Sequence, residues 1–459
     1  MAVIRKSTVG LLVLDTVAVL VCFNLALYLR ALINAPVLLP LLWPLAASVI
    51  AIYLVDGYKA RTDMMSLDYT SQHAIGLLTA LIFILLLTFV FVPAGYELQS
   101  SRSVILISFI VLIPVTLSYR RVAFAKLLQA RGVRSIIFVG DPVSCQAFQL
   151  ECNAIGMQQP VVHTVALKEA SSSAPPLTST IDIKIQPLEA VLQEIETGNM
   201  AVDSIVLRES SRDLPDDISR RLMLLYFQGV PTYTLELFHQ VYWRKIPIYR
   251  LNHTWLFQEG FPIAREPVFE RVKRLSDIML SSLGLILAVP LILPCAMLIW
   301  LEDRGPVFFR QNRIGRNRVP FRIIKLRTMR QGGTGGDKYT QPGDKRITRI
   351  GSLLRLTRLD ELPQLWNVLI GEMSLIGPRA EWDVLVDQYE AEIHCYHFRH
   401  LVKPGITGWA QVNYPYGANL EDTIRKLEYD LYYIRHFSFL LDAAIVLKTI
   451  HIMLFGKGR

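Results

Sequence analysis

Long apolar runs dominate the first quarter of the chain. They cover residues Val9–Leu29, Val37–Val55, Ala74–Gly95 and Ser103–Ser118. Because a membrane-crossing helix needs ~20 mostly apolar residues, the pattern predicts four transmembrane helices, the last of them extended into Tyr119. The first run is too long for the apolar part of a signal peptide, and it lacks the small-residue cleavage site that a signal peptide has. We therefore expect residues 1–125 to form a four-helix transmembrane segment.

A different pattern follows, from Arg134 to about His253, where short strand-like runs alternate with amphipathic stretches. The strand-like runs are RSIIFVGD, VVHTVAL, VDSIVLRES and VPTYTLEL. This alternation is typical of an α/β fold with a parallel sheet, so we expect a Rossmann-like domain over residues 130–255. Tight NAD binding would need G-x-G-x-x-G after the first strand, and only Gly140 is present. A regulatory role and an oligomeric role, such as a homodimer contact, both stay open for this domain.

A fifth apolar run, Ile278–Trp300, lies near the start of a third predicted domain, residues 266–459. It is long enough to cross a membrane, but Pro290 and Pro294 interrupt it, and Lys and Arg residues cluster before and after it. The positive-inside rule therefore favours a re-entrant helix over 278–300, which enters one leaflet and returns, rather than a fifth crossing. At the far end, Tyr429–Phe455 predicts an amphipathic helix at the membrane interface or an ordinary core helix.

The distribution of charge predicts how the chain is oriented in the membrane and which classes of partner it binds. Most basic residues near the first four helices flank the ends that lie on the same side as the N-terminus. By the positive-inside rule this side is cytoplasmic, so the N-terminus and everything after Ser118 are predicted to be cytoplasmic. The net charge of +9 over 459 residues suits anionic membrane lipids and phosphorylated substrates. No nucleic-acid-binding module is recognisable, so nucleic acid is not expected as a partner. The five cysteines show no C-x-x-C spacing, which argues against a disulfide framework and a zinc site.

The strongest chemical signal is a pair of adjacent carboxylates, Asp360 and Glu361. Between Arg304 and Arg358 the chain has fifteen Lys or Arg residues and only two acidic ones. Such a positive field should keep both carboxylates of the pair ionised, ready to act as a nucleophile or a metal ligand. The alternative is structural, because carboxylates favour the first turn of a helix and Pro363 fits there.

Five ordered motifs lie in the last 190 or so residues: Lys273-Arg274-x-x-Asp277, GPVFFRQNRIG from Gly305, FRIIKLRTM from Phe321, ITRIGSLLRLTRLDELPQLWNVLIGEMSLIGPR from Ile347 and KPGITGWAQVNY from Lys403. Together they resemble the bacterial sugar transferases, the monotopic phosphoglycosyl transferases. The layout before them is similar to the large polyprenyl glycosylphosphotransferases that start exopolysaccharide, capsule or O-antigen synthesis. The expected architecture is thus a membrane α-helical segment, an α/β Rossmann-like middle domain and a mainly α catalytic domain with a re-entrant membrane helix.

The resemblance implies transfer of a sugar-1-phosphate from a UDP-sugar to undecaprenyl phosphate at the bacterial inner membrane, with release of UMP. Asp360 matches the family's nucleophile, and Glu361 the residue that helps to hold Mg²⁺. Pro378, Arg379 and Gln411 match positions near the nucleotide. Cations are needed to offset repulsion between the phosphates, and the residues expected to supply them are Lys273, Arg274, Arg310, Lys325, Arg327, Arg355 and Arg379. Asp277 is expected to form an ion pair with Lys273 or Arg274.

Several alternatives remain open on the sequence. Asp360 acting as a base for direct attack by the lipid phosphate would leave the same residues in place as a covalent aspartyl intermediate. A non-catalytic scaffold for polysaccharide assembly would use the Asp-Glu pair only as a helix start. A membrane-bound nucleotide-sugar dehydratase or epimerase would also join helices to a Rossmann domain, but the chain has no G-x-G-x-x-G at Gly140.

Overall fold

A computed structural model gives the fold in two compact units. One consists of Met1–Arg131 with Ser438–His451, and the other of Gly132–Phe437 with Ile452–Arg459. We describe each unit by itself. The described residues are 2–31, 41–55, 57–58, 64–91, 102–131, 134–157, 159–165, 183–208, 214–248, 267–330, 346–393, 395–414 and 419–455.

The first unit is built on four apolar helices, α1 (Ala2–Ala31), α2 (Leu42–Leu54), α3 (Leu67–Phe91) and α4 (Arg102–Arg131). Their core joins Phe23 of α1, Leu77 of α3 and Phe109 of α4. Three of the four predicted passes contain a helix long and apolar enough to cross a membrane, within α1, α3 and α4. α2 has only 13 described residues, and the start of its predicted run, residues 37–40, lies outside the described part of the chain.

A buried polar cluster ties the cytoplasmic ends predicted for these helices together. Arg120 of α4 donates to the Asp15 carboxylate of α1. It also donates to the Gly57 carbonyl, at 2.5 Å. Tyr58 and Tyr119 also donate to the Asp15 carboxylate. Because an isolated charge is costly away from water, this mutual satisfaction is what allows Asp15 and Arg120 to be almost fully buried.

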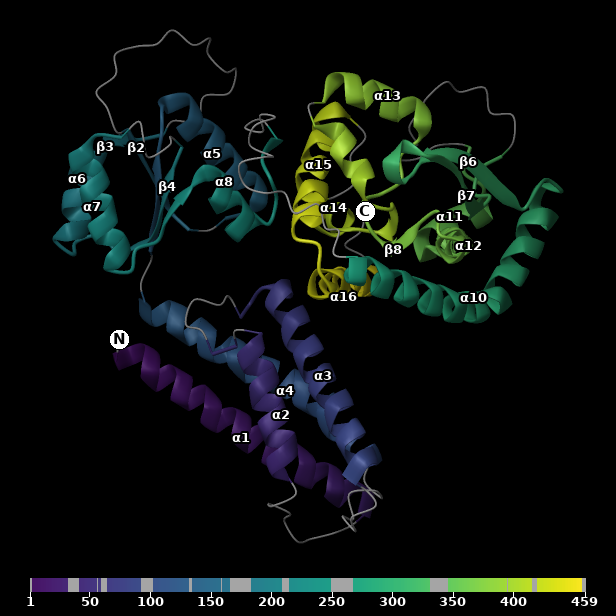
Figure 1. The fold of residues 1–459 in the computed structure, drawn as a ribbon, viewed down its shortest axis with the longest axis horizontal. Coiled ribbons are helices and arrows are strands. Elements are labelled where there is room, and N and C mark those ends of the chain that lie inside the picture. The colour runs from purple at the N-terminus through teal and green to yellow at the C-terminus, as the bar shows by residue number, and fades with distance from the viewer. Residues whose placement is uncertain are drawn as a thin grey trace. The chain divides into compact units, whose positions relative to one another are not determined.

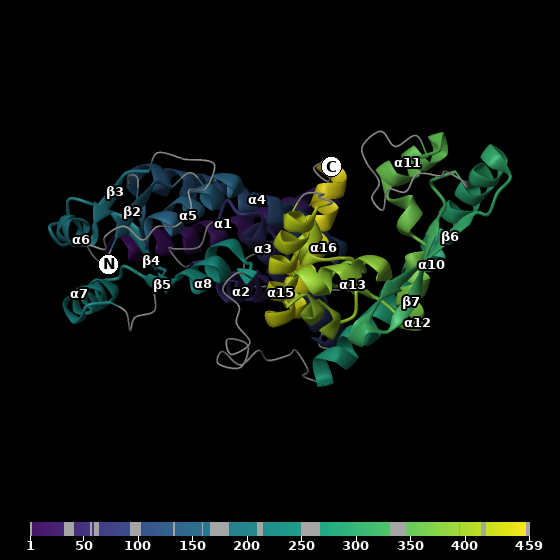
Figure 2. The same cartoon turned by 90° about the horizontal axis from the view of Figure 1, so that it is seen from above.

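The second unit begins with the predicted parallel sheet. Five parallel strands lie in the order β3-β2-β1-β4-β5: β1 (Ser135–Val139), β2 (Val161–Val165), β3 (Ile185–Pro187), β4 (Val202–Leu207) and β5 (Thr232–Thr234). Helices α6 (Leu188–Glu196) and α7 (Asp216–Phe227) cover one face, and α5 (Pro142–Ile155) and α8 (Leu235–Phe238) the other, as Figures 1 and 2 both show. Strand β3 was not predicted, because its three residues are too short to give a periodic signal.

Two apolar segments of the last part of the chain were predicted to be helices. α10 (Pro267–Asp303) is one continuous helix with Pro290 and Pro294 inside it, and Figure 1 shows it bent along its length. Its apolar stretch meets the length for a membrane span, and re-entry remains a prediction. The predicted single helix over Tyr429–Phe455 is wrong: α15 (Leu420–Arg435) ends first, and α16 (Phe439–Phe455) begins after three intervening residues.

The remaining elements pack on α10 and on one another. An antiparallel hairpin pairs β6 (Phe308–Ile314) with β7 (Pro320–Leu326), and a short parallel pair joins β8 (Ser374–Ile376) to β9 (Gly405–Thr407). The helices among them are α11 (Arg349–Thr357), the 3-10 turn η7 (Leu359–Glu361), α12 (Gln364–Ile370), α13 (Asp383–Glu392) and α14 (Trp409–Asn413). Phe321 and Ile323 of β7 share a core with Val368 of α12 and Met373, which fixes the hairpin against α12.

Candidate functional site

The Asp-Glu pair lies in a sharp turn between two helices. Thr348 caps the start of α11 by accepting from the Gly351 amide at 2.9 Å, and the helix ends at Arg358, whose φ of 59° is left-handed. That residue turns the chain into η7, after which Leu362 and Pro363 are right-handed helical and lead directly into α12. The turn places Asp360 inside the protein, with 8% of its surface exposed.

Three cations surround the Glu361 carboxylate. Its Oε1 accepts from Lys325 Nζ at 3.1 Å, and Arg379 Nη1 and Arg358 Nη1 lie 3.8 and 3.9 Å from it. Burial alone would raise the pKa of Glu361, but Lys325, Arg379 and Arg358 outweigh it and lower the pKa to about 2. Burial lowers the pKa of Lys325, with Glu361 opposing that shift. Glu361 is therefore a fixed negative charge at physiological pH, as predicted.

Asp360 differs from its neighbour. Its Oδ1 is buried and has no hydrogen-bond partner among the described residues. Burial, and then the charge of Glu361, raise the pKa of Asp360, although Lys325, Arg355 and Arg358 act in the opposite direction. At Asp360 burial thus outweighs the basic field, in contrast to Glu361, and the ionised state predicted for Asp360 stays a prediction. A desolvated carboxylate with an unused oxygen is a strong nucleophile or metal ligand once ionised.

The structure brings some predicted cations to this turn and places others elsewhere. Lys325 and Arg379 contact Glu361, and Arg355 donates from Nε to Thr328 at 2.9 Å on the same side. Arg358, which was not predicted as a site residue, joins them because the left-handed turn directs it back toward Glu361. Its position two residues before Asp360 was the available signal.

Four other predicted phosphate-binding residues have different neighbours. Arg274 donates to the Val368 and Leu369 carbonyls at 2.6 and 2.7 Å and so caps the end of α12. Lys273 Nζ lies 5.3 Å from the ring centroid of Phe437, and Arg327 forms an ion pair with Asp303. Arg310 is exposed on β6.

The ion pair predicted between Asp277 and Lys273 or Arg274 is wrong. Asp277 Oδ1 accepts from Ser374 Oγ at 3.2 Å and from the Leu375 amide at 3.1 Å, so it anchors β8 to α10 instead of pairing with Lys273 or Arg274.

The residues predicted near the nucleotide lie around the β8–β9 pair. The Pro378 carbonyl accepts from the Gly405 amide at 2.8 Å, and a side chain at Gly405 would meet the Gly377 backbone, so only glycine fits there. Gln411 donates from Nε2 to the Ile406 carbonyl at 3.2 Å, while its buried Oε1 has no partner among the described residues. Pro378 and Arg379 thus pair with Gly405 at the start of β9, and Gln411 with the next residue of that strand, Ile406.

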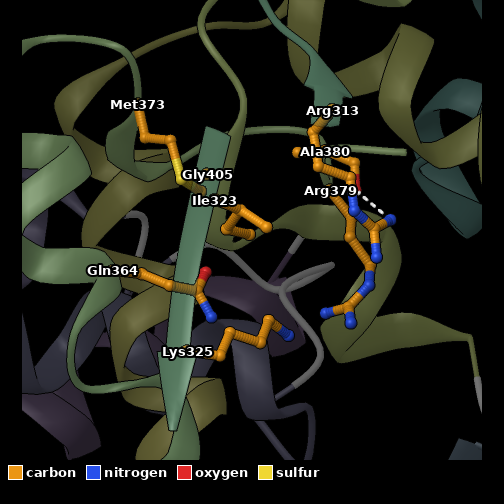
Figure 3. Close-up of a pocket in the computed structure, with 8 residues that line it drawn as sticks. All are labelled: Arg313, Ile323, Lys325, Gln364, Met373, Arg379, Ala380 and Gly405. Carbon is orange, nitrogen blue, oxygen red and sulfur yellow. Dashed lines mark hydrogen bonds between the residues drawn. The ribbon is translucent and has the colours of Figure 1, made fainter. Parts of the chain in front are cut away.

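A small cavity of about 10 Å³ lies between the hairpin and these turns (Figure 3). Its lining residues are Arg313, Ile323, Lys325, Gln364, Met373, Arg379, Ala380 and Gly405. Arg313 donates from Nη1 to the Ala380 carbonyl at 3.1 Å, which holds the guanidinium in place. Gln364 was not predicted, although it stands in the DELPQ stretch that carries the carboxylate pair.

Within the described residues, no cluster of three or more His, Cys, Asp or Glu side chains is present that could hold a metal alone. Mg²⁺ commonly binds through one or two carboxylates and the phosphates of a substrate. The Asp-Glu pair fits that pattern, because Asp360 Oδ1 is unpartnered and Glu361 makes its three ion pairs through Oε1 only.

Comparison with known proteins finds relatives over this part of the chain. The model of the bacterial sugar transferase family matches residues 268–456, which contain α10, the hairpin and the whole carboxylate turn. An exopolysaccharide production protein of Rhizobium leguminosarum bv. phaseoli is 39% identical over 186 residues, which cover 39% of this chain and 93% of the relative. The chain belongs to the bacterial sugar transferase family.

Two further relatives carry more specific names. A UDP-N-acetylgalactosamine-undecaprenyl-phosphate N-acetylgalactosaminephosphotransferase of Aeromonas hydrophila is 40% identical over 269 residues, 58% of this chain and 63% of the relative. A UDP-glucose:undecaprenyl-phosphate glucose-1-phosphate transferase of Klebsiella pneumoniae is 45% identical over 182 residues, 39% of each chain. In both cases the match spans less than two thirds of the relative.

Proposed function

We propose that this protein transfers a sugar-1-phosphate from a UDP-sugar to undecaprenyl phosphate and releases UMP, the first membrane step in building an exopolysaccharide or related glycan. The observation that carries the proposal is the buried Asp360, whose Oδ1 has no partner, next to a Glu361 that Lys325, Arg379 and Arg358 surround. A scaffold would gain nothing from leaving a buried carboxylate oxygen unpaired, because an unpaired buried polar atom is destabilising.

The proposed reaction has two displacements at phosphorus. A carboxylate oxygen of ionised Asp360 attacks the β-phosphorus of the UDP-sugar, and the bond from that phosphorus to the oxygen bridging the two phosphates breaks, so that UMP leaves with the electron pair. An oxygen of undecaprenyl phosphate then attacks the same phosphorus and displaces Asp360. Lys325 and Arg379 would offset the negative charge that gathers in each step.

Mg²⁺ belongs to the same proposal. Glu361, through Oε2, would hold the ion together with the diphosphate of the donor, and Asp360 is next to it in the chain. When bound, the ion would neutralise phosphate charge and stabilise the departing UMP. Pro378, Arg379 and Gln411 would lie against the nucleotide.

The position in the membrane follows from the lipid acceptor. We infer that the protein lies in the bacterial inner membrane, with α10 entering from the cytoplasmic side, bending and returning. The support is the pair of prolines inside α10 and the bend that Figure 1 shows. Such a helix would keep the carboxylate turn on the side where UDP-sugars and Mg²⁺ are found.

The test is UMP release by the purified full chain with Mg²⁺, undecaprenyl phosphate and a panel of UDP-sugars. UDP-N-acetylgalactosamine and UDP-glucose come first, because the two relatives are named for these donors. Asp360→Asn should abolish release, whereas the matched control Asp387→Asn, on the exposed face of α13, should not. Intact mass with the lipid withheld should show a sugar-phosphate adduct on the wild type.

Each other outcome has a meaning of its own. Release without an adduct would favour direct attack by the lipid phosphate with Asp360 as base. No release with any donor, or release that Asp360→Asn leaves unchanged, would refute the proposal and favour a scaffold. Bound nicotinamide, detected by its absorbance, would favour a dehydratase or epimerase.

A further inference from the structure

Gln364 is a buried polar residue in the wall of the cavity beside the carboxylate turn. It opens α12, with 3% of its surface exposed, and its Nε2 has no hydrogen-bond partner among the described residues. Buried amides in proteins are nearly always hydrogen-bonded, because losing water without a replacement partner costs free energy. A buried donor that no described residue pairs therefore points to a partner from outside the chain, which is water in the free protein and can be a substrate group in the complex.

The surroundings of Gln364 define the charge of that partner. The cavity it lines is also lined by Lys325 and Arg379, the two cations that contact Glu361. In Figure 3 the three side chains reach this cavity from different elements, Gln364 from α12, Lys325 from β7 and Arg379 from the segment after β8. All three are hydrogen-bond donors at this point, so the group that fits among them is an acceptor with negative charge.

The size of the cavity limits how much of the partner enters. Its volume of about 10 Å³ holds a single water-sized group. One non-bridging oxygen of a phosphate has that size, with the rest of the phosphate outside. A whole sugar ring or nucleobase does not fit.

The backbone relates Gln364 to the reacting carboxylate. Asp360 and Gln364 are four residues apart, and the residues between them and at the start of α12 are right-handed helical. Lys325 also connects the two residues, because it lines the cavity with Gln364, contacts Glu361 and acts on the charge of the Asp360 carboxyl. Asp360 Oδ1 and Gln364 Nε2, both without a partner among the described residues, therefore belong to one short stretch of chain beside one cation.

We propose that Gln364 is a catalytic residue of the transferase, whose amide donates a hydrogen bond to a non-bridging oxygen of the phosphoryl group under attack by Asp360. This inference rests on the proposed function and adds a residue to it. As the geometry around phosphorus flattens, charge builds on the non-bridging oxygens, so the hydrogen bond strengthens in the transition state. Gln364 would then act on turnover more than on binding of the donor.

The primary variant is Gln364→Met, which keeps the length of the side chain and removes the donor. We expect the rate of UMP release, and of adduct formation with the lipid withheld, to fall about 100- to 1,000-fold, as when an oxyanion donor is removed elsewhere. KM for the UDP-sugar should change less than about threefold, because the contact matters most in the transition state. Gln388→Met, on the exposed face of α13, is the matched control and should match the wild type.

A stability measurement separates catalysis from structure. Removing a donor that has no partner should leave the thermal unfolding midpoint unchanged or raise it, whereas removing a structural glutamine would lower it. Gln364→Glu is the second variant: it keeps the shape and introduces an acceptor, so it should lose at least as much activity as Gln364→Met.

The inference is overturned if Gln364→Met or Gln364→Glu turns over within about threefold of an active wild type, by comparison with the expected loss of an oxyanion contact. It is also overturned if Gln364→Met lowers the unfolding midpoint in step with activity. A wild type that releases no UMP from any UDP-sugar would instead refute the proposed function, and the wild-type arm of the same experiment reports that outcome separately.

Discussion

The ion pair between Lys325 and Glu361 offers the sharpest test of the site's electrostatics. Lys325→Met keeps most of the side-chain volume and removes the closest cation from Glu361. The two side chains are only 15% and 13% exposed, so water cannot replace the lost partner well. Arg379 and Arg358 remain at 3.8 and 3.9 Å and compensate in part.

The expected cost can be worked out in two ways. Lowering the pKa of Glu361 from 4.5 to about 2 corresponds to roughly 3 kcal/mol at ~1.4 kcal/mol per pKa unit. Removing one partner of a buried ion pair typically costs about 3–5 kcal/mol. The lowered pKa of Lys325 shows that burying this cation is itself costly, so we expect the low end, about 3 kcal/mol. For a domain of this size that is a fall of about 6–12 °C in the unfolding midpoint.

The assay is thermal unfolding of the purified chain in detergent across a pH series. Because the pKa of Glu361 is depressed, its stabilising effect is fully present above about pH 4.5 and is lost as the pH falls toward 2. In Lys325→Met the folded-state pKa of Glu361 is less depressed, so the acid loss should be smaller and should be complete at a higher pH. Arg318→Met is the control, since Arg318 is half exposed in its ion pairs and should cost at most about 1 kcal/mol. A midpoint within about 2 °C of wild type with an unchanged acid limb would refute the reasoning.

Three further predictions concern other parts of the chain. Burial and the charge of Glu361 raise the pKa of Asp360. As the pH is lowered, the rate of adduct formation should therefore begin to fall above the ordinary aspartate pKa of about 3.9. A rate profile whose acid limb lies at or below that value would contradict this prediction. Asp15→Asn leaves Arg120 buried without its charge partner and should destabilise the membrane unit by about 3–5 kcal/mol, measured by unfolding in detergent; failure of Arg120→Met to rescue it would count against the ion pair. Arg274→Met removes two hydrogen bonds to the end of α12 and should lower the stability by about 1–3 kcal/mol, with KM for the UDP-sugar unchanged. A raised KM at unchanged stability would show instead that Arg274 binds the substrate.

The sequence was most informative where a local pattern decides the structure. The strand-like runs around Ile136 and Ile205 are fully buried strands in a parallel sheet, because continuous apolar runs suit a sheet covered on both faces. The carboxylate pair was found by its contrast with the basic residues before it. By comparison, β3 and the break between α15 and α16 were missed or misread, since three-residue signals are too short for periodicity to resolve.

Charge counts alone could not assign the individual cations. Arg274 and Lys325 look alike in the sequence, since each stands in a motif of the family. Only the packing of α12 against α10 and β7 sends the first to a helix end and the second to Glu361. The same packing opposes the effect of the basic field at Asp360, because burial raises a carboxylate pKa whatever the number of distant cations.

The sequence by itself thus determined the apolar helices, the parallel sheet and the position of the Asp-Glu pair, all of which depend on residues close together along the chain. Only the tertiary structure decided which residues meet at that pair, since Lys325, Glu361, Gln364 and Arg379 come from segments up to 54 residues apart. That packing also decides which side chains are buried. Burial in turn causes the difference in pKa between Asp360 and Glu361 and leaves the amide nitrogen of Gln364 without a partner among the described residues, and neither can be read from the order of the residues.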